Sequence, residues 1–223
     1  TSTVSANADA GFSIVSYTGA GSAATIGHGL SQAPEMYIVK DRDTALTNWW
    51  TYHIGNTSAP ETDALRLNGT NVTTDDSTLF NDTAPTALVF SVGSYSEVSG
   101  NTKKYIAYCF HSVEGYSKVG SYTGNGSADG TFVHTSFKPK YIMLKRTDSA
   151  NNWVIRDTVR DTYNPNELTL KADESSSEVT KEDIDITSNG FKIRNSAGPY
   201  NASGGSYIYL AFAEVPFKYS TGV

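Results

Sequence analysis

GFSIVSYTGAGSAATIGHGLSQAPEMYIVKDRDTALTNWWTYH, residues 11–53, is followed by a related stretch, GYSKVGSYTGNGSADGTFVHTSFKPKYIMLKRTDSANNWVIRD, residues 115–157. The octapeptides at 16–23 and 121–128 are identical at seven of eight positions. Beyond them, both stretches keep the same order of a histidine, a proline, a lysine and an Asn-Trp pair: His28 and His134, Pro34 and Pro139, Lys40 and Lys145, Asn48-Trp49 and Asn152-Trp153. Self-similarity over the length of a small domain predicts a tandem duplication.

The duplication divides the 223 residues into three parts. We predict a linker or N-terminal arm over residues 1–10, a first domain over residues 11–113 and a second over residues 114–223. Each copy is long enough to bury its own core. The chain begins with Thr1, and we expect it to be a processed product or part of a longer polypeptide.

Short apolar segments with a period of two recur through both copies, as at Leu88, Phe90 and Val92. Alternation of this kind predicts half-buried strands, and glycine-rich segments or an Asn-Gly pair between them predict tight turns. Roughly seven such strands in each copy are typical of a sandwich or barrel. The sequence therefore predicts an all-β fold of two tandem, internally duplicated antiparallel β-sandwiches of jelly-roll type.

Charge and composition exclude several classes of partner. The net charge is −6 and no block of Lys or Arg is present, so nucleic-acid binding is disfavoured. The longest apolar run, residues 207–213, is too short to cross a bilayer. A single cysteine, Cys109, cannot form an intrachain disulfide, and its apolar surroundings predict a small buried core residue.

No catalytic pattern is present, and we predict no enzyme activity, no metal and no cofactor. The chain has four histidines without metal-ligand spacing, and it has no G-x-S-x-G sequence. Because His28 and His134 match between the copies, a shared role in the fold is favoured over a ligand or a base. A Ca²⁺ site built from five aspartates stays open as an alternative, although no D-x-D-x-D-G loop occurs: Asp41, Asp43, Asp148, Asp157 and Asp161.

Aromatic residues on one predicted strand are the first candidates for binding. Trp49 matches Trp153, so we expect both to be core residues. Strand alternation then puts Trp50 and Tyr52 on the opposite face. An exposed Trp/Tyr pair is expected to be covered by a binding partner. Three partners are considered: the second copy, a neighbouring subunit or a sugar.

Two further tyrosines, Tyr95 and Tyr200, lie in Gly/Ser-rich loops that precede the last strand of each copy. Binding residues are frequent in such loops. The alternative is that both rings only cover the end of their sandwich.

Three runs carry a resemblance to a known family: VGSYTGNGSADGTFVHTSFKPKYIMLKRTDSANNW at 119–153, SYSEVSGNTKKYIAYCFHSVEGYSKVGSY at 94–122 and GGSYIYLAFAEVPFKYS at 204–220. They resemble a domain of unassigned function that recurs in tail-fibre, tail and other virion proteins of marine bacteriophages. The resemblance implies a structural component on the surface of the virion. A receptor-binding fibre part or a capsid decoration would be such a component.

The same resemblance implies other virion proteins as partners, a homo-oligomer such as a trimer, and attachment to a host surface glycan. The alternative function is a carbohydrate-binding, lectin-like module or a polysaccharide depolymerase. A depolymerase would need acids such as Glu167 or Asp183 placed across a cleft.

Overall fold

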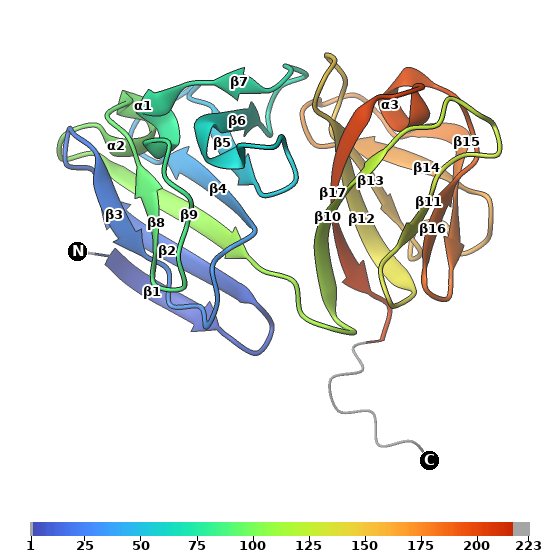
Figure 1. Ribbon diagram of the computed structural model, residues 1–223, viewed down its shortest axis with the longest axis horizontal. Helices are drawn as coiled ribbons and strands as arrows, with labels where there is room; N and C mark the ends of the chain where they lie inside the picture. Colours follow the sequence, from blue (N-terminus) through green and yellow to red (C-terminus); the bar gives the residue numbers. More distant parts are fainter. Residues whose placement is uncertain (1, 216–223) are drawn as a thin grey trace. The chain divides into compact units, whose positions relative to one another are not determined.

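The computed structural model describes residues 2–215, apart from the side chains of residues 181–183 (Figure 1). Residues 216–223, which the sequence analysis assigns to the second domain, lie outside the described part. The chain forms two compact units. Unit 1 comprises Thr1–Asn68 and Thr73–His111, and unit 2 comprises Gly69–Val72 and Ser112–Val223.

The predicted all-β class is confirmed. Helical structure among the described residues is limited to four short pieces: η1 Pro60–Thr62, α1 Ser77–Phe80, α2 Ser96–Ser99 and α3 Gly198–Asn201. All paired strands are antiparallel. No helix within residues 2–215 is long and apolar enough to cross a membrane.

Unit 1 has two antiparallel sheets. Its strands are β1 Ser2–Asn7, β2 Phe12–Thr18, β3 Ala24–Gly27, β4 Met36–Asp41, β5 Trp49–His53, β6 Asp63–Arg66, β7 Thr74–Asp75, β8 Val89–Val92 and β9 Lys104–Phe110. The larger sheet has the order β1-β2-β9-β4-β5-β6-β7, and β3 pairs with β8 in the smaller one. One hydrophobic cluster contains residues of both sheets, including Tyr37 of β4 and Phe90 of β8, as in a sandwich.

Unit 2 has one sheet of eight strands. They are β10 Ser117–Thr123, β11 Phe132–His134, β12 Pro139–Arg146, β13 Val154–Asp157, β14 Asn166–Lys171, β15 Val179–Thr187, β16 Gly190–Ile193 and β17 Ser206–Ala213. The order is β10-β17-β12-β13-β14-β15-β16-β11. Residues from distant strands of this sheet, such as Phe191 of β16 and Tyr209 of β17, share one core. The sheet therefore curls around that core and is nearly barrel-like (Figure 1).

The N-terminal residues differ from the sequence-based expectation. A linker or arm is predicted over residues 1–10, whereas Ser2–Asn7 forms strand β1 and pairs with β2 along its whole length. Five of its six residues are exposed, and the sixth is half-buried. The strand therefore has no alternation of apolar and polar residues by which it could be recognised. Backbone pairing with β2 stabilises it instead.

A stacked pair of tyrosines holds the short helix in each unit. In unit 1 the rings of Tyr17 and Tyr105 are 5.1 Å apart, and their hydroxyls donate to the carbonyls of Val98 (2.7 Å) and Ser96 (2.5 Å). A buried tyrosine needs a partner for its hydroxyl, and the helix carbonyls provide one for each.

Unit 2 repeats this arrangement with different residues around it. Tyr122 stacks on Tyr207 at 4.8 Å, and the two hydroxyls donate to the carbonyls of Tyr200 (2.8 Å) and Gly198 (2.6 Å). Burial raises the pKa of Tyr122 well above its usual value, so the hydroxyl stays protonated. The tyrosines of the repeated SYTG sequence are therefore structural residues.

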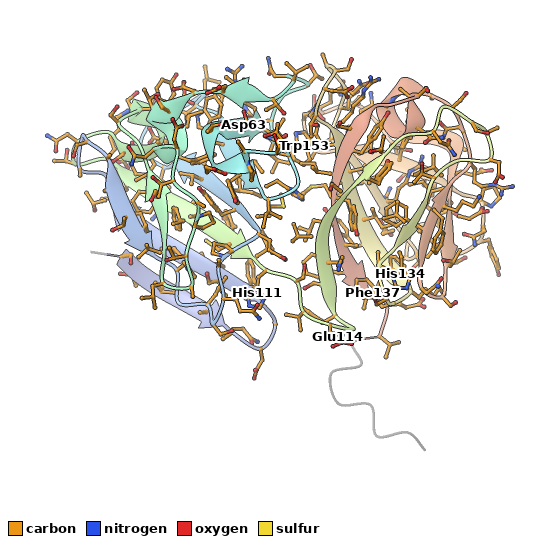
Figure 2. The ribbon with its side chains drawn as sticks, viewed as in Figure 1. Asp63, His111, Glu114, His134, Phe137 and Trp153 are labelled. Atoms are coloured by element: carbon orange, nitrogen blue, oxygen red, sulfur yellow. The ribbon has the colours of Figure 1, made fainter. Side chains whose placement is uncertain are left out.

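The prediction for Cys109 is confirmed, and the one for the histidines is confirmed for only one of them. Cys109 is fully buried in the core of unit 1. His28 is also buried, with Nε2 3.0 Å from the Thr86 carbonyl, and its Nδ1 accepts a hydrogen bond from the amide of Leu30. His134 is exposed near the end of β11 (Figure 2), so the two histidines do not share a role in the fold.

Candidate ligand-binding site

The faces assigned to strand β5 from the sequence are wrong. Trp50 and Tyr52 are 3% and 2% exposed and belong to the hydrophobic core of unit 1. Trp49, the expected core residue, is half-buried on the other face, where its ring stacks on Tyr108 at 6.3 Å. The reason is the pairing with β4, because Tyr52 lies opposite the core residue Tyr37 and directly opposed residues share a face.

Trp50 has partners within unit 1, so it needs no second copy, subunit or sugar to cover it. Its Nε1 donates to Oε2 of Glu97 at 2.7 Å. The guanidinium carbon of Arg66 lies 4.9 Å from the centre of its ring, and Tyr95 meets the ring edge-on at 6.0 Å. Tyr95 is 38% exposed, so it is the only one of the four predicted binding aromatics that is open to solvent.

In unit 2 the predicted aromatics are also buried. Tyr200 is 3% exposed, and its hydroxyl accepts a hydrogen bond from Nη2 of the buried Arg156. Trp153 is 1% exposed, as expected for a core residue, but the β13 residue in the hydrophobic cluster is its neighbour Val154. Tyr200 also does not correspond to Tyr95. The backbone carbonyl of Tyr200 accepts the hydroxyl of Tyr122, and in unit 1 the equivalent acceptor is the carbonyl of Val98.

A small polar cavity lies instead on the loop between β13 and β14 of unit 2. Its volume is about 160 Å³. Five loop residues line it, Thr158, Asp161, Thr162, Tyr163 and Asn164, together with Lys138 and Ile186. Of these residues, the sequence pointed only to Asp161, as a candidate Ca²⁺ ligand.

The first part of this loop is held by Asp157, the last residue of β13. Its Oδ1 accepts the amides of Val159 (3.0 Å) and Arg160 (2.8 Å), and its Oδ2 pairs with Nε of Arg160 at 2.6 Å. Burial alone raises the pKa of Asp157, but the hydrogen bonds and the charge of Arg160 outweigh it and hold the pKa below its usual value. Asp157 is therefore ionised at neutral pH and keeps this turn closed.

The middle of the loop is held by Asp161 and Asn166. Oδ2 of Asp161 accepts the amides of Glu167 and Leu168, the latter at 3.2 Å. Asn166 is 1% exposed, and its Nδ2 donates to the backbone carbonyls of Asp157 (2.9 Å) and Asp161 (3.0 Å). A buried amide that joins two points of the loop limits how far it can open.

The last part of the loop is tied to strand β15 by Asn164. Its Oδ1 accepts the amide of Ile186 at 2.9 Å, and its Nδ2 donates to the carbonyl of the same residue at 2.7 Å. The loop is therefore fixed at its beginning, middle and end, and the cavity exists before any ligand arrives. Such preorganisation reduces the entropy lost on binding.

Two large side chains of the same loop point into solvent. Tyr163 is 83% exposed and Val159 is 65% exposed. Tyr163 also lines the cavity, so an open aromatic ring lies beside fixed polar groups. A concave site with a few convergent polar groups is the usual form of a small-ligand site.

Comparison with models of protein families gives a match over residues 1–216 to a family described as a domain of unknown function, DUF7483. The chain belongs to this DUF7483 family. Neither the curated proteins nor the solved structures contain a match.

The aspartates considered for Ca²⁺ make other contacts in this DUF7483 domain. Across the described residues, no three His, Cys, Asp or Glu side chains are grouped so that they could hold a metal ion. Asp41 accepts the amides of Asp43 and Thr44 and pairs with Lys103 at 3.3 Å, and Asp148 pairs with Arg146.

One signal in the sequence could have identified the cavity. The loop after β13 reads TVRDTYNPN, whereas the loop in the same position after β5 reads IGNTSAPET and has no aromatic residue. A tyrosine between polar residues in one copy alone marks a possible exposed aromatic. The partners from β15 and from residues before β12 have no such signal.

Proposed function

We propose that this chain is a non-enzymatic attachment module that contacts carbohydrate on a cell surface through the cavity of unit 2. The observation that carries the proposal is the exposed Tyr163 on a loop that is held by hydrogen bonds beside polar side chains. Sugars present both apolar ring faces and hydroxyls, so an aromatic ring next to hydrogen-bonding groups suits them.

Binding is favoured over hydrolysis by the groups in the cavity. Asp161 is the one carboxylate among its described lining residues, and one of its oxygens already accepts two backbone amides. A glycosidase needs two carboxylates on either side of the scissile bond. Of the acids considered for a depolymerase, Glu167 does not line the cavity, and the side chain of Asp183 lies outside the described part.

We also propose that the two units arose by duplication of one jelly-roll-like domain. The order β2-β9-β4-β5-β6 in unit 1 corresponds to β10-β17-β12-β13-β14 in unit 2. The stacked tyrosines that hold α2 and α3 make equivalent hydrogen bonds. A shared strand order and a shared polar contact, together with the sequence repeat, support a common origin.

The place of the module is proposed from the sequence resemblance alone. It is a virion structural protein of a bacteriophage, as a tail-fibre, receptor-binding or capsid-decorating component exposed on the particle. Its partners are other virion proteins, further copies of the chain in a homo-oligomer such as a trimer, and a host surface glycan.

A glycan array combined with a reducing-sugar release assay tests the function. We expect retention on a subset of glycans without release of reducing ends. Tyr163→Ala should remove retention, whereas Tyr95→Ala, which removes a less exposed tyrosine of unit 1, should not. Release of reducing sugar, or no retention on any glycan, would contradict the proposal.

A further inference from the structure

We infer that the cavity of unit 2 takes one neutral pyranose ring and discriminates against uronic acids. The inference rests on the proposed function and adds the ligand class. It follows from three properties of the cavity: its size, its balance of charge and the hydrogen-bonding groups that the fold leaves unused.

The size of the cavity limits the ligand to a single ring. Its volume of about 160 Å³ is below the usual range of roughly 300–1,000 Å³ for sites that enclose drug-sized molecules. An oligosaccharide would therefore place one residue in the cavity and leave the others outside. Val159, which is 65% exposed on the same loop, offers an apolar contact for a neighbouring residue.

The charges around the cavity disfavour an anionic sugar. Lys138 is the one basic residue among the described lining residues, and its Nζ is paired with Oε2 of Glu214 at 2.8 Å. Asp161 adds a second negative charge without an ion pair of its own among the described contacts. A carboxylate on the ligand would meet the acid Asp161 and a lysine that is already paired, which is unfavourable at short range.

The unused hydrogen-bonding groups suit hydroxyls. Asn164 uses one of its two Nδ2 hydrogens for the Ile186 carbonyl, which leaves one donor. Oδ1 of Asp161 has no hydrogen bond among the described residues and remains an acceptor. Thr158 and Thr162 add hydroxyls that both donate and accept. A sugar hydroxyl donates and accepts at the same atom, so it can satisfy both kinds of group.

The apolar face of the sugar ring can contact two side chains of the cavity. Tyr163 is 83% exposed, so most of its ring is free to stack, and the side chain of Ile186 completes the cavity on strand β15. Because Asn164 is bonded to Ile186 by both of its amide atoms, the backbone beside Tyr163 is held at strand β15. Stacking and hydrogen bonding therefore act on the same ring.

The test is titration calorimetry or saturation-transfer NMR with methyl glycosides as probes. The panel contains the methyl pyranosides of glucose, galactose, mannose and N-acetylglucosamine, with those of glucuronic and galacturonic acid as anionic counterparts. For a single ring we expect a Kd on the order of 1 mM for at least one neutral probe. The matching uronate should bind at least about tenfold more weakly at low salt. Raising NaCl from about 50 to about 500 mM should leave the neutral probe unaffected.

Four variants locate the site. Tyr163→Ala should weaken the neutral probe about tenfold, and Tyr163→Phe, which keeps the ring, should bind as the parent does. Asp161→Asn keeps an oxygen for the backbone amides but removes the charge, so it should narrow the preference for the neutral probe over its uronate. Leu88→Ala, at an exposed apolar residue of unit 1, is the matched control and should change nothing.

The outcomes separate the inference from the function on which it rests. Uronates that bind as tightly as neutral sugars would overturn the inference while the attachment function stands. Neutral binding that is unchanged in Tyr163→Ala, or a preference over the uronate that is unchanged in Asp161→Asn, would place the site elsewhere and overturn the inference as well. Absence of binding to every glycan, free or immobilised, would remove the proposed function itself.

Discussion

Replacing the two adjacent tryptophans of β5 one at a time tests the assignment of faces in unit 1. Trp50 is 3% exposed in the core, whereas Trp49 is half-buried on the opposite face. Truncation of a buried tryptophan to alanine costs about 3–5 kcal/mol in the free energy of unfolding. For Trp49→Ala we expect about 1–2 kcal/mol, because only part of its apolar surface is removed from water.

The loss for Trp50→Ala includes a polar contact. Glu97 Oε2 accepts Trp50 Nε1 at 2.7 Å and both nitrogens of Asn48 at 3.0 Å. Glu97 is only partly buried, so water can replace the missing donor, and this contact adds little to the cost of the cavity. Trp50→Phe, which keeps an aromatic ring but removes the donor, should therefore cost less than Trp50→Ala.

Urea unfolding followed by circular dichroism, with a thermal scan in parallel, measures these differences. For a unit of this size, each 1 kcal/mol shifts Tm by about 4–8 °C, so Trp50→Ala should lower the transition of unit 1 by roughly 12 °C or more. Trp49→Ala should lower the same transition by a smaller amount. The reasoning is refuted if Trp49→Ala destabilises unit 1 as much as Trp50→Ala does.

Three further predictions concern the core and the loop. Burial raises the pKa of Cys109 from 9.0 to about 12, so the stability that the protonated thiol contributes is complete below pH 9. The free energy of unfolding should then fall by up to about 1.4 kcal/mol per pH unit as the pH rises toward 12. Urea titrations should find this loss reduced in Cys109→Ala. Asn166→Ala leaves two loop carbonyls without their buried donor, so it should cost about 1–3 kcal/mol and speed amide exchange in residues 157–166, whereas equal exchange rates would show that the loop is held by other contacts. Tyr17→Phe and Tyr122→Phe each remove one hydroxyl bond to a helix carbonyl and should destabilise their units by similar amounts of about 1 kcal/mol; unequal Tm shifts would contradict their equivalence.

The fold class was predictable because it depends on local patterns. Alternation of apolar residues at Leu88, Phe90 and Val92 and the glycines between strands restrict the chain to short strands and tight turns. Strand β8 begins at Val89, and Leu88 before it is 78% exposed. The pattern therefore predicted that a strand exists here but placed its first residue too early. Strand β1 was missed, because exposed Ser, Thr and Asn residues have no apolar face by which a strand can be recognised.

The faces of a strand were not predictable from alternation alone. Alternation separates Trp49 from Trp50 but is symmetrical, so it does not say which of the two is inside. The choice depends on the partner strand, since Val39 of β4 lies opposite Trp50 and is itself in the core. The matched Asn-Trp pairs suggested the opposite choice.

By itself, the sequence determined that this chain is all-β and that Cys109 is buried, because both follow from residues that are neighbours along the chain. It also determined that the pattern repeats, because residues 11–53 and 115–157 can be compared directly. Only the tertiary structure decided where the polar cavity of unit 2 lies. The cavity joins Lys138 to a loop around Tyr163 and to Ile186 on β15. Residues this far apart in sequence come together because β12 pairs with β13 and β14 pairs with β15, and hydrogen bonds such as that from Asn164 to Ile186 then hold them there.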